Sequence, residues 1–69
     1  MVVIVSKYIY NDFNTDEAVE WAVENCPSFE KYMMVELEFE ERQQRDCWFR
    51  FDIYFADERD ALFYSMKWS

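Results

Sequence analysis

The first apolar block of the chain, Val2 to Tyr10, is rich in β-branched and aromatic residues and contains no breaker. Such a run predicts a strand that is buried on both faces and central in its sheet. A polar loop follows, in which Asn14 and Glu17 have the spacing of a capped helix start, with Thr15 as the alternative cap. The helix that this cap begins ends before Pro27 and has an apolar stripe made of Ala18, Val19, Ala22, Val23 and Cys26.

Two later segments alternate with a period of two, which is the pattern of half-buried strands. The apolar face of the first segment comprises Met33, Val35, Leu37 and Phe39, and that of the second comprises Cys47, Phe49, Phe51, Ile53 and Phe55. Together they predict an antiparallel hairpin, joined by a polar loop over Glu41 to Asp46, whose apolar face lies under the helices. In either plausible register, Glu36 or Glu38 lies opposite Arg50.

The C-terminal segment allows two interpretations. Asp57 can cap a short helix over Glu58 to Leu62, and the alternation of Tyr64, Met66 and Trp68 then predicts a final strand. The order βαββαβ is that of a ferredoxin-like sandwich, an α+β fold with a four-stranded antiparallel sheet and two helices on one face. The alternative is one continuous helix over Ala56 to Trp68, which gives the order βαββα.

Composition supports one folded domain over residues 1–69, because 52% of the residues are hydrophobic although the net charge is −8. The chain has no glycine, so glycine-rich phosphate loops are excluded, and it has no histidine, the commonest general base and metal ligand. We therefore expect no enzymatic activity, no metal and no cofactor. Cys26 and Cys47 are expected to be buried free thiols in a reducing cytoplasm. The N-terminal apolar run is too short to span a bilayer, so no membrane partner is expected.

The C-terminal sequence DALFYSMKW, Asp60 to Trp68, resembles an ending found in small, acidic, uncharacterised proteins of tailed bacteriophages. The protein is expected to act in the host cytoplasm. The resemblance implies a ferredoxin-like fold, a viral origin and an unassigned role. It assigns no functional residues.

In a ferredoxin-like fold the sheet face opposite the helices stays open, and we expect it to bind protein. The candidate residues on that face are Trp48, Tyr54, Arg50, Glu36, Glu38, Glu40 and Asp52. Exposed rings bordered by charges are typical of an interface, and spaced carboxylates can imitate nucleic-acid phosphates. The expected partner is therefore a host protein, for example a nucleic-acid-handling enzyme. The alternative is a homo-oligomeric structural or accessory protein, such as a homodimer through the open face. Nucleic acid is disfavoured as a partner, because 15 acidic residues outnumber 7 basic ones.

Overall fold

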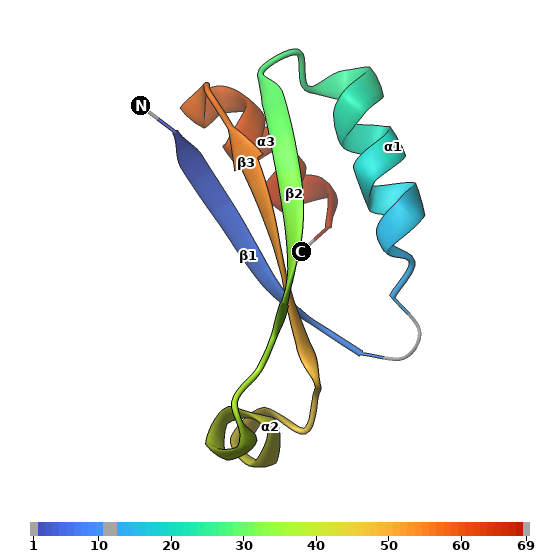
Figure 1. The fold of residues 1–69 in the computed structure, drawn as a ribbon. Helices are drawn as coiled ribbons and strands as arrows, with labels where there is room; N and C mark the ends of the chain where they lie inside the picture. Colours follow the sequence, from blue (N-terminus) through green and yellow to red (C-terminus); the bar gives the residue numbers. More distant parts are fainter. Residues whose placement is uncertain (1, 11–12, 69) are drawn as a thin grey trace.

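The computed structural model describes residues 2–10 and 13–68, which form an α+β fold. In chain order the elements are β1 (Val3–Ile9), α1 (Thr15–Asn25), β2 (Phe29–Glu36), α2 (Phe39–Arg45), β3 (Phe49–Phe55) and α3 (Glu58–Lys67). Within the described residues the sheet has three strands in the order β1-β3-β2, and both pairings are antiparallel. Helices α1 and α3 lie on the same face of the sheet, whereas α2 lies beyond one end of the strands (Figure 1).

The expected fourth strand is absent from the described part of the chain, so the four-stranded ferredoxin-like prediction is wrong. Helix α3 continues through the residues predicted to form that strand, and the fold is compatible with the βαββα alternative. Burial explains the outcome: Tyr64 is 1% exposed and Met66 is 70% exposed, although both would lie on one face of a strand. Ala61 and Tyr64, three residues apart, share the inward face of a helix instead.

The central strand is β3, not β1 as predicted from the apolar N-terminal run. Val5 of β1 and Tyr32 of β2 both lie opposite Ile53 of β3. Because β1 pairs on one edge only and carries a helix on one face only, its burial alternates over much of its length. The prediction failed because the sequence of a short apolar strand does not show how many neighbours it has.

The hairpin connection is a helix and not the predicted polar loop over Glu41 to Asp46. Strand β2 ends at Glu36, and α2 begins at Phe39. The segment contains good helix formers and lacks a two-residue turn sequence, and Glu41 and Arg45 have the favourable acid-to-base spacing of four. The helix ends at Asp46, which adopts the left-handed conformation with φ 54°. In a chain without glycine, aspartate is one of the residues that tolerate this conformation best.

The register of β2 differs from the prediction, so each of its side chains from Met33 onward lies on the opposite face of the sheet from the one predicted. Val35, not Glu36 or Glu38, lies opposite Arg50. Met33 and Val35 therefore lie on the open sheet face and not in the core, because residues directly opposite each other share a face. An irregularity between Phe29 and Lys31 accompanies this register.

The core lies between the two covering helices and the sheet. Its buried residues are Ala18, Ala22, Cys26, Phe51, Ile53, Phe55, Ala61 and Tyr64. The expected burial of Leu37, Phe51 and Ile53 is confirmed, whereas Phe39 and Phe49 are exposed and Val23 faces solvent. Both cysteines are buried and free, as expected. The predicted caps are also confirmed: Asn14 accepts a hydrogen bond from Glu17 N, and Asp57 accepts one from Arg59 N.

Ser28, in the turn before β2, ties that turn to the start of α3. Its backbone N–H donates to Asp60 Oδ2 at 2.8 Å, and its hydroxyl accepts from Asp57 N at 3.0 Å. Hydrogen bonds from Ser28 lower the pKa of the Asp60 carboxyl. These bonds fix where the second covering helix begins.

A larger side chain at position 22 tests how closely α1 packs on the sheet, because the side chain of Ala22 is completely buried. We expect Ala22→Leu to lower the free energy of unfolding by about 1–3 kcal/mol through overpacking. Urea unfolding followed by circular dichroism measures the change. Val23→Leu, one position along the same helix, is the matched control and should leave the midpoint within error because Val23 is exposed. Equal effects of the two substitutions would contradict the observed orientation of α1.

Tyr64 makes stability sensitive to alkaline pH. Burial, with a smaller contribution from Cys26, raises the pKa of its phenol to about 12, whereas the unfolded value is about 10. The stabilising contribution is therefore complete below about pH 10 and is lost as pH rises from there towards 12, because only the unfolded chain ionises in that window. We expect Tyr64→Phe to reduce this loss, as measured by urea unfolding at pH 8, 10 and 11. An unchanged pH profile would show that other groups cause the loss.

Candidate protein-binding site

The seven residues predicted to form one binding surface lie in two places. Arg50, Asp52 and Tyr54 alternate along β3 and lie on the open sheet face, as predicted. The other four, Trp48, Glu36, Glu38 and Glu40, lie at the end of the sheet where α2 joins the strands. The structure therefore brings together only part of the predicted surface on the sheet.

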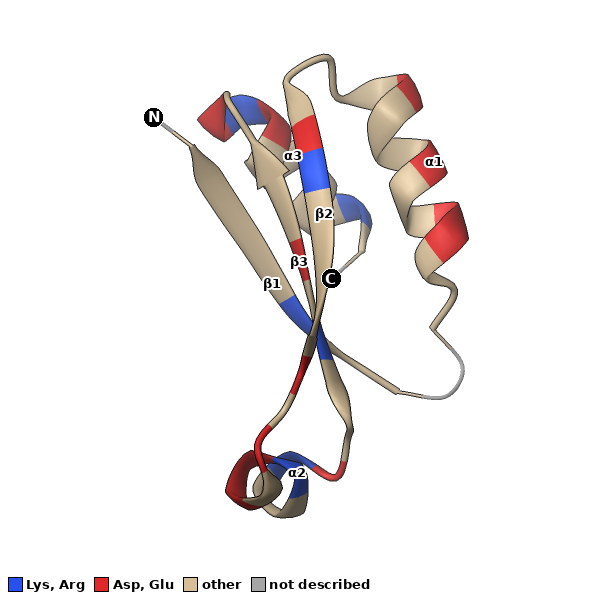
Figure 2. Cartoon of the chain, in the orientation of Figure 1, with Lys and Arg blue, Asp and Glu red and all other residues tan. Residues whose placement is uncertain are grey.

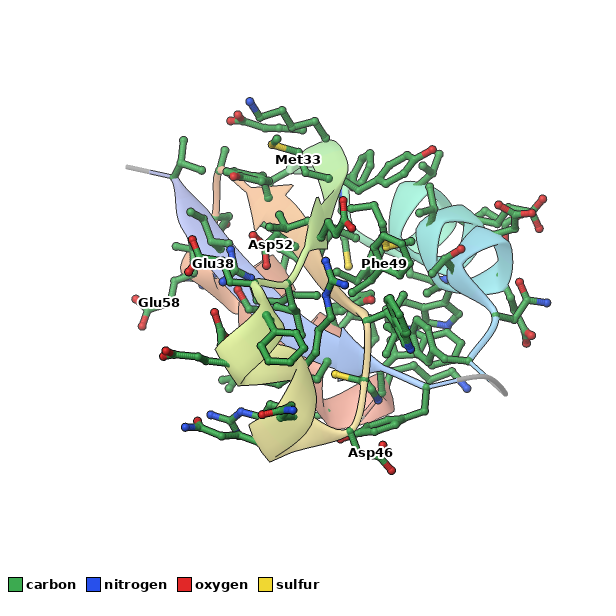
Figure 3. All side chains as sticks on the ribbon, turned by 60° about the horizontal axis from the view of Figure 1, so that its bottom comes forward. Met33, Glu38, Asp46, Phe49, Asp52 and Glu58 are labelled. Carbon is green, nitrogen blue, oxygen red and sulfur yellow. The ribbon has the colours of Figure 1, made fainter. Side chains whose placement is uncertain are left out.

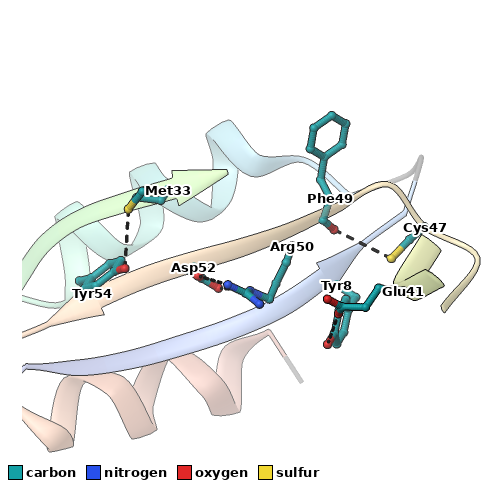
Figure 4. A network of polar contacts seen from close by, with 8 residues as sticks. All are labelled: Tyr8, Met33, Glu41, Cys47, Phe49, Arg50, Asp52 and Tyr54. Atoms are coloured by element: carbon teal, nitrogen blue, oxygen red, sulfur yellow. Dashed lines mark hydrogen bonds and ion pairs between the residues drawn. The ribbon is translucent and has the colours of Figure 1, made fainter. Parts of the chain in front are cut away.

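On the open face, Arg50 and Asp52 satisfy each other. Arg50 donates two hydrogen bonds to the Asp52 carboxylate, at 3.0 Å from Nε and 3.1 Å from Nη2 (Figure 4). The hydrogen bond to Asp52 raises the pKa of Arg50. Asp52 is only 5% exposed, so its carboxylate is buried against the sheet under the guanidinium. This pair is engaged within the chain and offers little charge to a partner.

The rings of the open face also have partners within the chain. The Tyr54 hydroxyl donates to the Met33 sulfur at 3.6 Å, and the Lys31 ammonium lies 4.9 Å from the Tyr54 ring centroid. Tyr8 is covered by Arg45 of α2, whose Cζ lies 4.4 Å from the ring centroid. Helix α2 thus packs against one end of the open face, and less of this face is accessible to a partner than predicted.

The stronger candidate is the surface around α2, which we call the α2 corner. It comprises the exposed rings of Phe39, Trp48 and Phe49 and the exposed acids Glu36, Glu38, Glu40 and Asp46. Trp48 is 63% exposed and Phe39 is 69% exposed. Figure 3 labels three members of the corner, and Figure 2 shows acidic segments on and beside α2. A patch of large rings among carboxylates is the arrangement expected of an interface.

Arg42 organises this corner from within the chain. Its Nε donates to the Leu37 carbonyl at 2.7 Å, and its Nη2 pairs with Glu36 Oε1 at 2.8 Å. Its Cζ lies 4.7 Å from the Trp48 ring centroid. The guanidinium is therefore held by a carbonyl, a carboxylate and an aromatic face. Arg42 fixes Trp48 beside α2 and removes Glu36 from the acids that are free to meet a partner.

Hollows lie next to Trp48. One, of about 500 Å³, is lined by Ile9, Tyr10, Asp46, Cys47, Trp48 and Phe49. Another, of about 300 Å³, is lined by Phe39, Arg42, Gln43, Asp46, Cys47 and Trp48. Because Trp48 borders both hollows, side chains from a partner can pack beside the indole.

Sequence reasoning missed Phe39, Phe49 and Asp46 as members of this surface. The period of two predicts that Phe39 and Phe49 lie in the core, but both are exposed. The missed signal was the helix-forming sequence after Phe39, which ends the strand and turns that ring outward. No sequence signal identified Asp46, although aspartate tolerates the left-handed conformation that ends α2.

The Arg50 and Asp52 pair should behave as a structural unit. Removing only the guanidinium leaves a buried carboxylate without its counter-charge, so Arg50→Met should lower the free energy of unfolding by about 2–4 kcal/mol. The double substitution Arg50→Met/Asp52→Leu should recover most of that loss. Urea unfolding of the two single variants and the double variant measures the coupling. Additive effects would show that the pair is not coupled.

Among residues 2–10 and 13–68, no group of acidic or cysteine side chains is arranged to hold a metal ion. In the same part of the chain, the helices are all too short or too polar to cross a membrane. Comparison of the chain with family models, with curated proteins and with solved structures found no match in any of the three.

Proposed function

We propose that this chain is a non-catalytic acidic protein that binds a basic surface of another protein through the α2 corner. The observation that carries the proposal is the exposure of Trp48 beside Phe39, Phe49 and the exposed carboxylate of Asp46. Exposed tryptophan costs solvation free energy in the isolated protein and is the side chain most often central to an interface.

The chemistry of the corner favours a cationic partner. Arg42 supplies an internal example, because its guanidinium is already stacked on the Trp48 ring and bonded to Glu36. Arginine or lysine from a partner can meet Asp46 beside the indole, where cation–π and charge attraction act together. Glu38 and Glu40, at the other end of α2, extend the acidic surface. A net charge of −8 adds long-range attraction to any basic surface.

Two other partners have less support. A base-stacking platform needs accessible rings on the sheet, but Tyr8 and Tyr54 are stacked with Arg45 and Lys31 of the same chain. On the open sheet face Arg50 and Asp52 already neutralise each other, so a second copy of the chain would gain no ion pair from them. For both reasons we place the proposed interface at the α2 corner and not on the open sheet face.

The finer proposal concerns the origin and the target of the protein. The resemblance of its last residues to bacteriophage proteins suggests that the partner is a protein of the bacterial host. The acids of the corner then compete for a basic site that otherwise binds nucleic-acid phosphates. Support for this step comes from the charge balance and the spacing of the carboxylates.

The α2 corner can be tested by capture from bacterial lysate with immobilised wild type and immobilised variants. Trp48→Ala should reduce the amount of the captured partner by about tenfold or more, as expected for a central interface tryptophan. Phe39→Ser is a second variant with the same expected direction. Because Phe39 is exposed, we expect this substitution to leave the bait folded. Quantitative mass spectrometry measures the ratio between baits.

Charge is tested separately with two variants of equal net charge. Glu38→Gln/Glu40→Gln should slow association and weaken its dependence on salt, whereas Asp16→Asn/Glu20→Gln on α1 should have a smaller effect. Association rates of the captured partner at several salt concentrations decide between them. If both pairs act equally, only net charge matters and the corner has no special role.

If Trp48→Ala and Phe39→Ser capture the same proteins as wild type, the proposed interface is wrong.

A further inference from the structure

Helix α3 is apolar on both sides, although only one side packs against the core. Ala61 and Tyr64 face inward and are buried. The outer side carries Leu62, Phe63 and Met66, which are 63%, 50% and 70% exposed. We call these three residues the α3 stripe. A helix that packs on a sheet needs one apolar stripe, so a second one marks a surface for something else.

The α3 stripe continues onto α1 through an aromatic contact. The Trp21 ring lies 5.2 Å from the Phe63 ring, centroid to centroid, with an angle of 45° between the ring planes. Trp21 also lies 6.2 Å from Tyr64, so it closes the space between the two helices. The outer surface of the helical layer therefore has an apolar strip that crosses from α3 to Trp21.

Carboxylates border this strip on the α1 side. Glu17 and Glu24 lie four residues before and three residues after Trp21, so they share its side of the helix. Figure 2 shows acidic segments along the outer side of α1. In its last turn α1 has no basic residue to offset these charges. On α3 the only flanking bases within the described residues are Arg59 and Lys67, near the two ends of the stripe.

We propose that the outer surface of α1 and α3 binds a basic amphipathic helix of a partner protein. Such a helix would place its apolar side on the α3 stripe and Trp21, and its lysine or arginine side over Glu17 and Glu24. Methionine and leucine suit this role because their flexible side chains adapt to a packed helix. Charge decides against a second copy of the chain as the occupant, since two copies of net charge −8 would bring like-charged α1 surfaces together.

This surface is distinct from the α2 corner, which lies beyond the end of the sheet, away from α1 (Figure 1). It adds a helical docking mode, whereas the α2 corner presents rings and acids around one tryptophan. The two surfaces can therefore be tested independently, and either can fail without the other.

The experiment uses a synthetic peptide of about 14 residues, in which leucine and lysine follow helical spacing, so that one face is apolar and the other basic. Titration into the isotope-labelled full chain is followed by amide NMR, and affinity is measured by calorimetry. We expect shifts at the outer residues of α1 and α3. Leu62→Gln/Met66→Gln should weaken binding by about tenfold or more. A peptide of the same composition without the helical pattern should bind more weakly than the patterned one.

Matched variants separate docking from general attraction between opposite charges. Met33→Gln, on the open sheet face and outside both surfaces, should leave the affinity unchanged. Glu17→Gln/Glu24→Gln should weaken it more than Glu38→Gln/Glu40→Gln, which changes the net charge equally. The glutamine pairs also keep the test decisive if Leu62→Gln/Met66→Gln proves unstable. Shifts centred on the α2 corner, equal affinity for the two peptides, or formation of a dimer that Leu62→Gln/Met66→Gln abolishes would overturn the proposal.

Discussion

The burial of Tyr64 is the interaction on which the arrangement of the elements depends. Its ring lies 5.5 Å from Phe55 of β3, 6.2 Å from Trp21 of α1 and 6.4 Å from Trp68, centroid to centroid. One side chain of α3 therefore contacts the central strand and the other covering helix. With Tyr64 in this place the last segment has to be a helix, because a strand would turn Met66 inward with it. The sheet consequently remains three-stranded over the described residues.

The open sheet face follows from that choice. Both covering helices are on one side, so Arg50, Asp52 and Tyr54 of β3 face away from them. Among the described helices only α2 reaches this face, at one end, where Arg45 covers Tyr8. Arg50 of the same chain covers the Asp52 carboxylate, so neither charged side chain is free to pair with a partner protein. An isolated buried carboxylate would be far more costly than the pair. An open face in this fold is therefore compatible with a stable monomer, and its openness alone does not indicate an interface.

The sequence predicted the helix starts and the main core strand, because these depend on residues close together in the chain. Asn14 and Asp57 cap their helices as expected, and the alternation around Phe51 and Ile53 identified the strand that contributes most to the core. The wrong predictions concern features that depend on residues far away in the sequence. Tyr64, Met66 and Trp68 fit a strand, while Ala61, Tyr64 and Trp68 fit a helix, and a window this short supports both. The place of Met33 and Val35 depended on a register irregularity before Lys31, which reverses every later side chain of the strand. Of the candidate surface, the sequence identified Trp48 and the glutamates but could not show that α2 would separate them from Tyr54.

The small size of the core explains why so much apolar surface remains outside it. Ala18, Ala22 and Ala61 line the contact between helices and sheet, and their small side chains let the helices approach closely. That close approach leaves no volume for rings such as Phe39, Trp48 and Phe63, so a chain with 52% hydrophobic residues must place many of them at the surface. Unprotected apolar patches cause self-association, and like charges around them oppose it. In the function that we propose, the carboxylates near Trp48 and Trp21 oppose contact between identical copies and also attract a basic partner.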